Sequence, residues 1–172
     1  FIEVFGLNPN SASATIEKAI AVEKEFNELF PQSTSITPHS TYSLSKDLWA
    51  KLRQVMDTES SPVSIHFAES FAEYEFLSQG TGPMLERYKS LGIPFDIPNK
   101  LSPRLVVVDN IGEDKSILLV HATFASMEEL LLLSKHFRKV TLVLCPESNL
   151  FIEGQLPNLH SIYTSGLGVA IG

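Results

Sequence analysis

Short runs of apolar residues alternate along this chain with segments whose apolar residues recur at helical spacing. The clearest runs are Val63–Ala68, Ser116–His121 and Val140–Cys145. Strands that are separated by helices predict a parallel sheet covered by helices. The continuous apolar character of the runs agrees, because a parallel sheet is buried on both of its faces.

Six strands are predicted in all, and the other three are Phe1–Phe5, Ser35–Thr37 and Val169–Ile171. Such an α/β fold, with about six parallel strands and covering helices, fits either a doubly wound open sheet or a (β/α) barrel. A loop rich in proline is expected at 92–103. The helices are predicted at about 13–30, from a cap at Ser45 to Val55, at 71–77, at 83–91, from a capping box at Ser126–Glu129 to about His136, and at 157–164.

Composition narrows the range of partners. The chain has 172 residues, enough for one domain, and a formal net charge of -7 without any block of Lys or Arg. Nucleic acid and anionic membranes both reward clustered positive charge, so neither is expected as a partner. The only cysteine, Cys145, ends an apolar run and is expected to be a buried structural thiol, which fits a cytoplasmic protein without disulfides.

Three of the five histidines stand at or just past the C-terminal end of a predicted strand: His39, His66 and His121. The active site of a (β/α) barrel lies on that face, and a doubly wound sheet follows the same rule. We therefore expect the three imidazoles to serve one site. The other two, His136 and His160, are expected at the solvated surface, on a helix end and a loop.

His66 and Glu69 carry the sharpest chemical hypothesis. Because side chains alternate along a strand, His66 can point into a barrel mouth and offer one ring nitrogen to a metal. Glu69 follows three residues later and could move a proton to and from an attacking water. The competing interpretation is a core histidine, followed by a carboxylate that is favoured near the start of a helix.

Five segments resemble motifs of the metal-dependent amidohydrolase superfamily, in the family's order along the chain. The resemblance covers about residues 36–172 and is to the branch of cytosine, guanine and adenosine-type deaminases and triazine chlorohydrolases. The segments are Ile36–Ser45 (similar to "HAPYTVS"), Ile65–Ser70 ("HxxE"), Leu119–Ala122 ("LxHG", with Glu128-Glu129-Leu130 as "eEL"), Cys145–Leu150 ("CPxSN") and Gly166–Gly172 (the approach to "GTDS").

This resemblance implies a partial TIM-type barrel, with residues 1–172 as a single partial domain that holds strands three to eight. It also implies a hydrolase that acts on a carbon–nitrogen bond other than a peptide, through a metal-activated water. The substrate would be a small molecule, such as a nucleobase-like or other amine- or amidine-bearing heterocycle.

The same resemblance assigns roles to individual residues. His66 would be a metal ligand, Glu69 the general acid and base, and His121 a partner of the attacking hydroxide or the substrate. His39 would contact the substrate, while Ser148 and Asn149 would shape the loop after strand seven. Since no Lys stands at 36–40 to bridge two metals, one divalent metal is expected, with zinc favoured and iron the alternative.

The chain also departs from the family's pattern. It contains no His-x-His pair, which supplies two ligands in the family, and the Asp ligand of strand eight would fall two residues beyond Gly172. We therefore expect this stretch alone to bind metal weakly and to be inactive. Its open barrel edges predict either contacts between chains, as in a homo-oligomer, or a longer protein.

Two other functions remain open at this stage. One is a non-catalytic binding or regulatory domain on a doubly wound sheet, which predicts that His39, His66 and His121 do not converge. The other is a degenerate barrel that serves as an interaction module. Position 122 is Ala where the family usually has Gly, which is a tolerable change.

Overall fold

The computed structural model describes residues 1–31 and 34–172, which contain six strands and nine helical segments. Every paired strand runs parallel to its neighbour. All six predicted strands are confirmed, each to within one residue at either end. They are β1 (Ile2–Val4), β2 (Ile36–Pro38), β3 (Val63–Phe67), β4 (Ser116–His121), β5 (Lys139–Leu144) and β6 (Gly168–Ile171).

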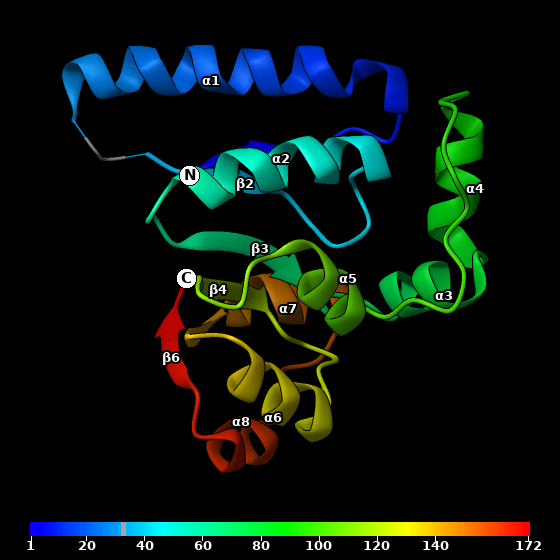
Figure 1. Ribbon diagram of the computed structural model, residues 1–172. Helices are drawn as coiled ribbons and strands as arrows, with labels where there is room; N and C mark the ends of the chain where they lie inside the picture. The colour runs from blue at the N-terminus through cyan, green and yellow to red at the C-terminus, as the bar shows by residue number, and fades with distance from the viewer. Residues whose placement is uncertain (32–33) are drawn as a thin grey trace.

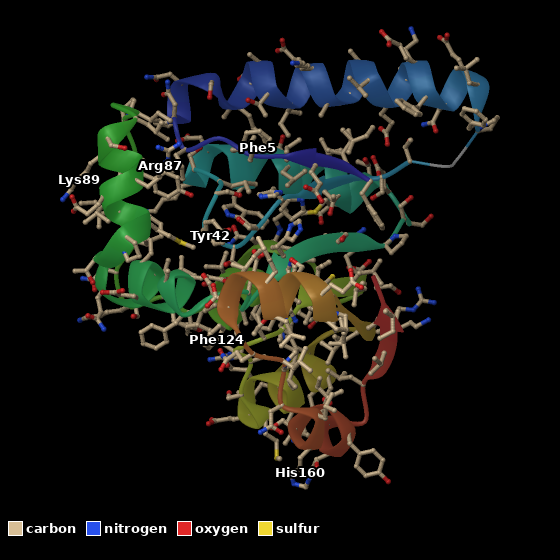
Figure 2. The ribbon with its side chains drawn as sticks, turned by 180° about the vertical axis from the view of Figure 1, so that it is seen from behind. Phe5, Tyr42, Arg87, Lys89, Phe124 and His160 are labelled. Atoms are coloured by element: carbon tan, nitrogen blue, oxygen red, sulfur yellow. The ribbon has the colours of Figure 1, made fainter. Side chains whose placement is uncertain are left out.

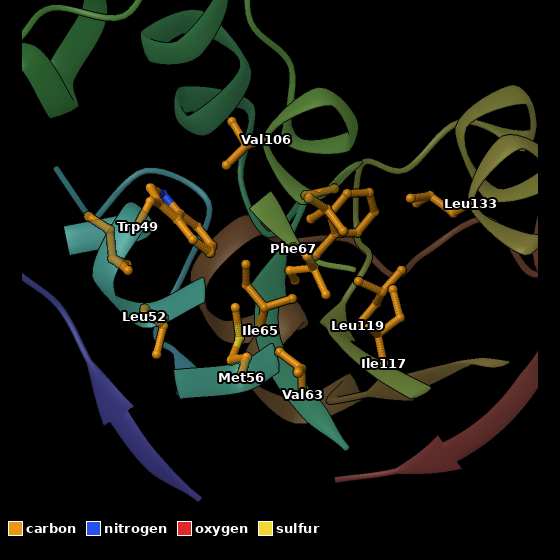
Figure 3. Close-up of a cluster of buried hydrophobic side chains, with 14 of the residues drawn as sticks. Trp49, Leu52, Met56, Val63, Ile65, Phe67, Val106, Ile117, Leu119 and Leu133 are labelled. Atoms are coloured by element: carbon orange, nitrogen blue, oxygen red, sulfur yellow. The ribbon is translucent and has the colours of Figure 1, made fainter. Parts of the chain in front are cut away.

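The strands lie side by side in the order in which the chain makes them. β1 pairs with β2, and a second ladder runs β3-β4-β5-β6. An isolated bridge between Ser40 and His66 joins the two ladders, so the order continues from β2 to β3. A doubly wound sheet reverses its strand order at a switch point, and this one does not. The arrangement is that of a partial (β/α) barrel, and Figure 3 shows the strands following an arc from β1 to β6.

Thr37 strengthens the junction between β2 and β3 where the ladder is short. Its hydroxyl accepts a hydrogen bond from the Ser64 amide at 2.8 Å and donates one to the Ser64 carbonyl. The His66 amide then donates to the His39 carbonyl at 3.0 Å. These bonds bring the segments that carry His39 and His66 together at the C-terminal ends of the strands.

Most of the helices cover one side of the arc, and the helix that follows β5 lies on the other (Figure 1 and Figure 2). Ser45 caps α2 as predicted, and Ser126 forms the predicted capping box with Glu129 at the start of α6. The segments are η1 (Pro9–Ser11), α1 (Ala12–Leu29), α2 (Lys46–Thr58), α3 (Phe71–Gln79), α4 (Gly82–Ser90), α5 (Pro103–Asn110), α6 (Met127–His136), α7 (Pro146–Glu153) and α8 (Leu159–Ser165). None of these described helices combines the length and the apolar character needed to cross a membrane.

Besides the short η1, two helices lie outside the predicted ranges. The proline-rich loop expected at 92–103 includes Pro103, yet this residue is the first of α5, after a Ser102 cap that accepts from the Leu105 amide. Likewise, the sequence predicts a loop at Ser148 and Asn149, which lie within α7, a helix that begins at Pro146. In both cases proline opens the helix, because the first helical position needs no amide donor.

The core lies between the strands and the helices. Val63, Ile65 and Phe67 of β3 are almost completely buried, and β4 presents Ile117 and Leu119 beside them in register. Figure 3 shows these side chains against Trp49, Leu52 and Met56 of α2, Val106 of α5 and Leu133 of α6. Burying each such side chain contributes roughly 1.5–3 kcal/mol. Since one face of β3 is held by this core, the alternate residue His66 must face the other side.

Candidate active site

His66 projects from β3 on the face opposite the core. Its Nδ1 lies 2.5 Å from the backbone carbonyl oxygen of His39. A carbonyl oxygen can only accept a hydrogen bond, so Nδ1 carries the proton and Nε2 keeps a free lone pair. Histidines that bind metals commonly donate a hydrogen bond from their second ring nitrogen in this way, which fixes the tautomer and the ring orientation. The geometry therefore fits the role of a ligand for His66.

His121 reaches the same place by a departure from regular strand geometry. It pairs with Phe67 in register, and continued alternation would turn its ring toward the helices. Its φ of 75° lies instead in the left-handed region, and its ring stacks on that of His66 at 5.3 Å between centroids. For residues other than glycine this conformation costs on the order of 1 kcal/mol, and such strain is common at functional sites.

Two polar side chains hold the buried His121 ring. Nδ1 donates to Asn149 Oδ1 at 2.8 Å, and Nε2 lies 3.3 Å from Glu69 Oε1. Asn149 is 2% exposed, and its Nδ2 has no hydrogen-bond partner among the described residues. Because Asn149 Oδ1 can only accept, it keeps a proton on Nδ1, and Nε2 of the neutral ring presents its lone pair to the Glu69 carboxyl group, a geometry that suits proton transfer between the two groups.

Glu69 sits on a tight turn between β3 and α3. The preceding residue, Ala68, has a left-handed φ of 49°. The carboxylate of Glu73 accepts hydrogen bonds from the amides of Ala68 and Glu69, at 3.2 and 2.8 Å. Burial raises the pKa of Glu73 to about 7, although its hydrogen bonds with Thr41 and these two amides act to lower it.

Tyr42 lies beside this pair of carboxyl groups. Burial is the largest cause that raises the pKa of its hydroxyl, and the charges of Glu69 and then Glu73 raise it further. Its phenol therefore stays protonated at neutral pH. Tyr42 follows Thr41 in the segment after β2. This segment therefore borders the site at Tyr42 as well as at His39.

His39 forms the other side of the cluster. Its ring lies 4.6 Å from that of His66 between centroids, and its Nδ1 lies 2.7 Å from Glu3 Oε2 of β1. Ligand atoms of Glu3, His39 and His66 all lie within 4.8 Å of one another, so these side chains could contribute to a metal site. The family resemblance assigns only His66 of the three as a ligand.

The structure thus brings all four predicted site residues together at the C-terminal ends of β2, β3 and β4. The ring centroids of His39 and His66 lie 4.6 Å apart, and those of His66 and His121 lie 5.3 Å apart. Nε2 of His121 lies 3.3 Å from Oε1 of Glu69. The alternative of a doubly wound sheet, in which the three histidines do not converge, is wrong. The strand order brings the carboxyl ends of β2, β3 and β4 to one place.

The remaining predictions for single residues fare unevenly. His160 is exposed at the end of the molecule away from α1, but in α8 rather than in a loop (Figure 2). His136 ends α6 and is half-buried, with its ring against Phe137. The sequence predicts a buried structural thiol at Cys145, and the structure has it half-buried, because it follows β5 as the cap of α7. Burial raises the pKa of its thiol, which keeps the sulfur protonated and a poor nucleophile.

Sequence reasoning missed Glu3 and Glu73, and it predicted for Asn149 a loop-shaping role rather than a hydrogen bond with His121. A signal existed for Glu73, since Ser70 and Glu73 have the spacing of a capping box, and Ser70 does cap α3. Asn149 fell in a segment interpreted as a loop. Glu3 lies within a short strand, and nothing in its neighbourhood indicates a role.

The comparisons with known proteins agree with this geometry. The model of the amidohydrolase family matches residues 3–172. An adenosine deaminase of Helicobacter pylori is 27% identical over 176 residues, which covers 99% of this chain and 42% of that protein. The chain therefore spans less than half the length of this relative.

Solved structures give the same result. An aminofutalosine deaminase of Helicobacter pylori, in complex with methylthio-coformycin, superposes with a TM-score of 0.81 at 26% identity, over all of this chain and 42% of that one. An adenosine deaminase of Xanthomonas campestris with bound zinc has a TM-score of 0.60 at 23% identity, over 91% of this chain and 32% of that one, which shows the fold alone. The family match, the strand order and the convergent site lead to one conclusion: this chain belongs to the amidohydrolase family.

Proposed function

We propose that the whole protein is a metal-dependent deaminase, which hydrolyses the bond between a heterocycle and its exocyclic amino group. The observation that carries this proposal is the contact between Glu69 and His121 beside the free Nε2 of His66. A proton acceptor, a second proton-carrying group and a metal-binding nitrogen within one cluster are what hydrolytic deamination needs.

Proton transfer in this proposal rests on Glu69. Its carboxylate takes a proton from the attacking water and returns it to the departing amino group. His121, held by Asn149, donates from or accepts at Nε2 and steadies the oxygen that attacks. His39 contacts the substrate from the side of β2, and the 2.7 Å contact between its Nδ1 and Glu3 Oε2 orients the ring for that role.

A divalent metal, with zinc favoured, would make a bound water acidic enough to attack near neutral pH. The residues of this chain fit such a metal in part. His66 has the tautomer of a ligand and an oriented ring, while three further ligands are expected from outside residues 1–172. The zinc named with the Xanthomonas campestris structure supports this choice of metal.

The substrate class is inferred from the relatives. Their names point to adenosine and aminofutalosine, so an aminopurine nucleoside is the class proposed here. Such a substrate carries its amino group on a flat heterocycle, which can lie against the His39 and His66 rings. Adenosine is the natural first compound to assay.

The test is metal content and ammonia release from adenosine, measured on the full-length protein with and without His66→Ala. The wild type should hold about one equivalent of metal after dialysis and release ammonia, and the variant should lose most of both. His160→Ala, on the exposed surface of α8, is the control and should keep both. An unchanged metal content in His66→Ala would contradict the proposal, and so would a metal-replete wild type that leaves adenosine intact.

A further inference from the structure

We propose that Glu73 is a positioning residue that fixes where the Glu69 carboxyl group lies. This inference rests on the proposed function. Glu73 lies in α3, is completely buried, and meets Glu69 through the Glu69 backbone amide. Its carboxylate accepts hydrogen bonds from the backbone of the turn from which Glu69 projects.

Two of its hydrogen bonds hold the turn itself. Oε1 of Glu73 accepts from the Ala68 amide at 3.2 Å, and Oε2 accepts from the Glu69 amide at 2.8 Å. Ala68 has a φ of 49°, a conformation that alanine adopts only when its surroundings compensate. The carboxylate thus supplies both acceptors that keep these consecutive amides aimed inward and Glu69 aimed at His121.

A third hydrogen bond links the turn to the segment after β2. Oε1 of Glu73 also accepts a hydrogen bond from the Thr41 hydroxyl, and Thr41 is 3% exposed. Thr41 stands two residues after His39 and just before Tyr42. One buried carboxylate therefore fixes the spacing between the segment that carries His39 and the turn that carries Glu69.

Only a carboxylate suits this position. It presents two oxygens, both of which accept, to three donors. A glutamine of the same size offers one oxygen, and its amide nitrogen would meet a backbone N–H donor with a donor. Glu73→Gln should therefore release one of the two amides and let the turn relax, while Glu73→Asp keeps two acceptors and loses one methylene of reach.

The experiment is a double-mutant cycle on the full-length, metal-loaded protein, with adenosine as the assayed compound. Glu73→Gln should lower kcat about 10- to 100-fold, change KM less than about threefold and keep the metal, since misplacement by a fraction of an ångström harms proton transfer more than binding. In a Glu69→Gln background, the same change should lower kcat no further, because the group that Glu73 positions is already gone.

Controls separate positioning from general damage. Glu75→Gln, in the same helix and half-exposed, should leave kcat and KM unchanged. Thr41→Val should fall between Glu73→Gln and wild type, since it removes one donor and leaves both amides paired. Binding of methylthio-coformycin to Glu73→Gln should stay within about threefold of the wild type, which reports a folded site without relying on turnover.

The outcomes distinguish this inference from the proposed function. If Glu69→Gln lowers kcat but Glu73→Gln does not, or if the two effects add fully, Glu73 does not act through Glu69 and the inference fails. If Glu69→Gln itself leaves kcat unchanged, the proposed function fails first. A Glu73→Gln variant that loses its metal and no longer binds methylthio-coformycin would show a role in folding, and would also overturn the inference.

Discussion

At the scale of single residues, the site is built from backbone conformations that ordinary strands avoid. Ala68, His121 and Ala122 all have positive φ values, and they end the neighbouring strands β3 and β4. The Ala122 amide donates to the Phe67 carbonyl, and the Phe124 amide donates to the Ala68 carbonyl, so the two turns support each other. This geometry directs the side chains of Glu69 and His121 toward His66.

The φ of 52° at Ala122 explains why the related motif has glycine at this position. Replacing Ala122 by Gly removes the clash of a Cβ in the left-handed region and should raise the free energy of unfolding by up to about 1 kcal/mol. Chemical denaturation of the full-length protein would measure this. Ala125→Gly, at a buried position without positive φ, should instead destabilise, and equal effects of the two changes would contradict the strain argument.

Glu73 should also give stability a defined pH dependence. Its pKa rises from 4.5 to about 7 on folding, mainly through burial, so the folded state holds this proton more tightly than the unfolded chain. The resulting stabilisation is full below about pH 4.5 and is lost as pH rises from there to about 7, on the order of 3 kcal/mol in total. Glu73→Gln cannot titrate, so the wild type should lose stability relative to it across this window. Parallel pH curves from urea denaturation would contradict the assignment.

At the scale of elements, the sequence pattern predicted what depends on periodicity and failed where a single residue decides. The strands followed from apolar runs, and the starts of α2 and α6 from Ser45 and Ser126, because burial and capping are local signals. The helices α5 and α7 were missed because Pro103 and Pro146 look alike whether they break a loop or open a helix. The convergence of the histidines followed from the strand ends alone.

What remained beyond sequence reasoning were the contacts between elements. No periodicity reveals that α7 supports β4, yet Asn149 of α7 accepts the hydrogen bond from His121. Similarly, Thr41 and Glu73 lie 32 positions apart and meet only in the folded chain. Such pairs depend on packing of elements that the sequence describes one at a time.

The support that α7 gives to β4 can be tested at Asn149. Asn149→Leu removes the acceptor for His121 Nδ1–H and leaves a buried donor unpaired, unless the ring changes its tautomer. We expect kcat/KM for adenosine to fall at least about 10-fold with the metal retained. The imidazole ¹⁵N shifts of His121 should show the loss of a pure Nδ1–H tautomer. Glu153→Gln at the end of α7 is the control, and a His121 spectrum unchanged in Asn149→Leu would refute the role.

At the scale of the whole molecule, the described residues form a barrel sector with two free edges. β1 and β6 end the strand order, and every residue of β6 is exposed. Since the chain covers 42% of its Helicobacter pylori relative, a longer protein could supply partners for both edges and the further ligands of the metal. We predict that partners for both edges come either from the same chain or from a second copy. Sedimentation of the full-length protein would distinguish these two sources.

The proposed function depends on Glu69 as the proton carrier in a metal-dependent deamination. Its most direct test is kcat for adenosine with Glu69→Gln, determined on the full-length protein at equal metal content. We expect a loss of at least about 10³-fold, because the amide keeps the size of the side chain but cannot accept the proton of the attacking water. A variant that holds its metal and turns over adenosine within about tenfold of the wild type would contradict it, and would leave Glu69 as a carboxylate that merely precedes a helix.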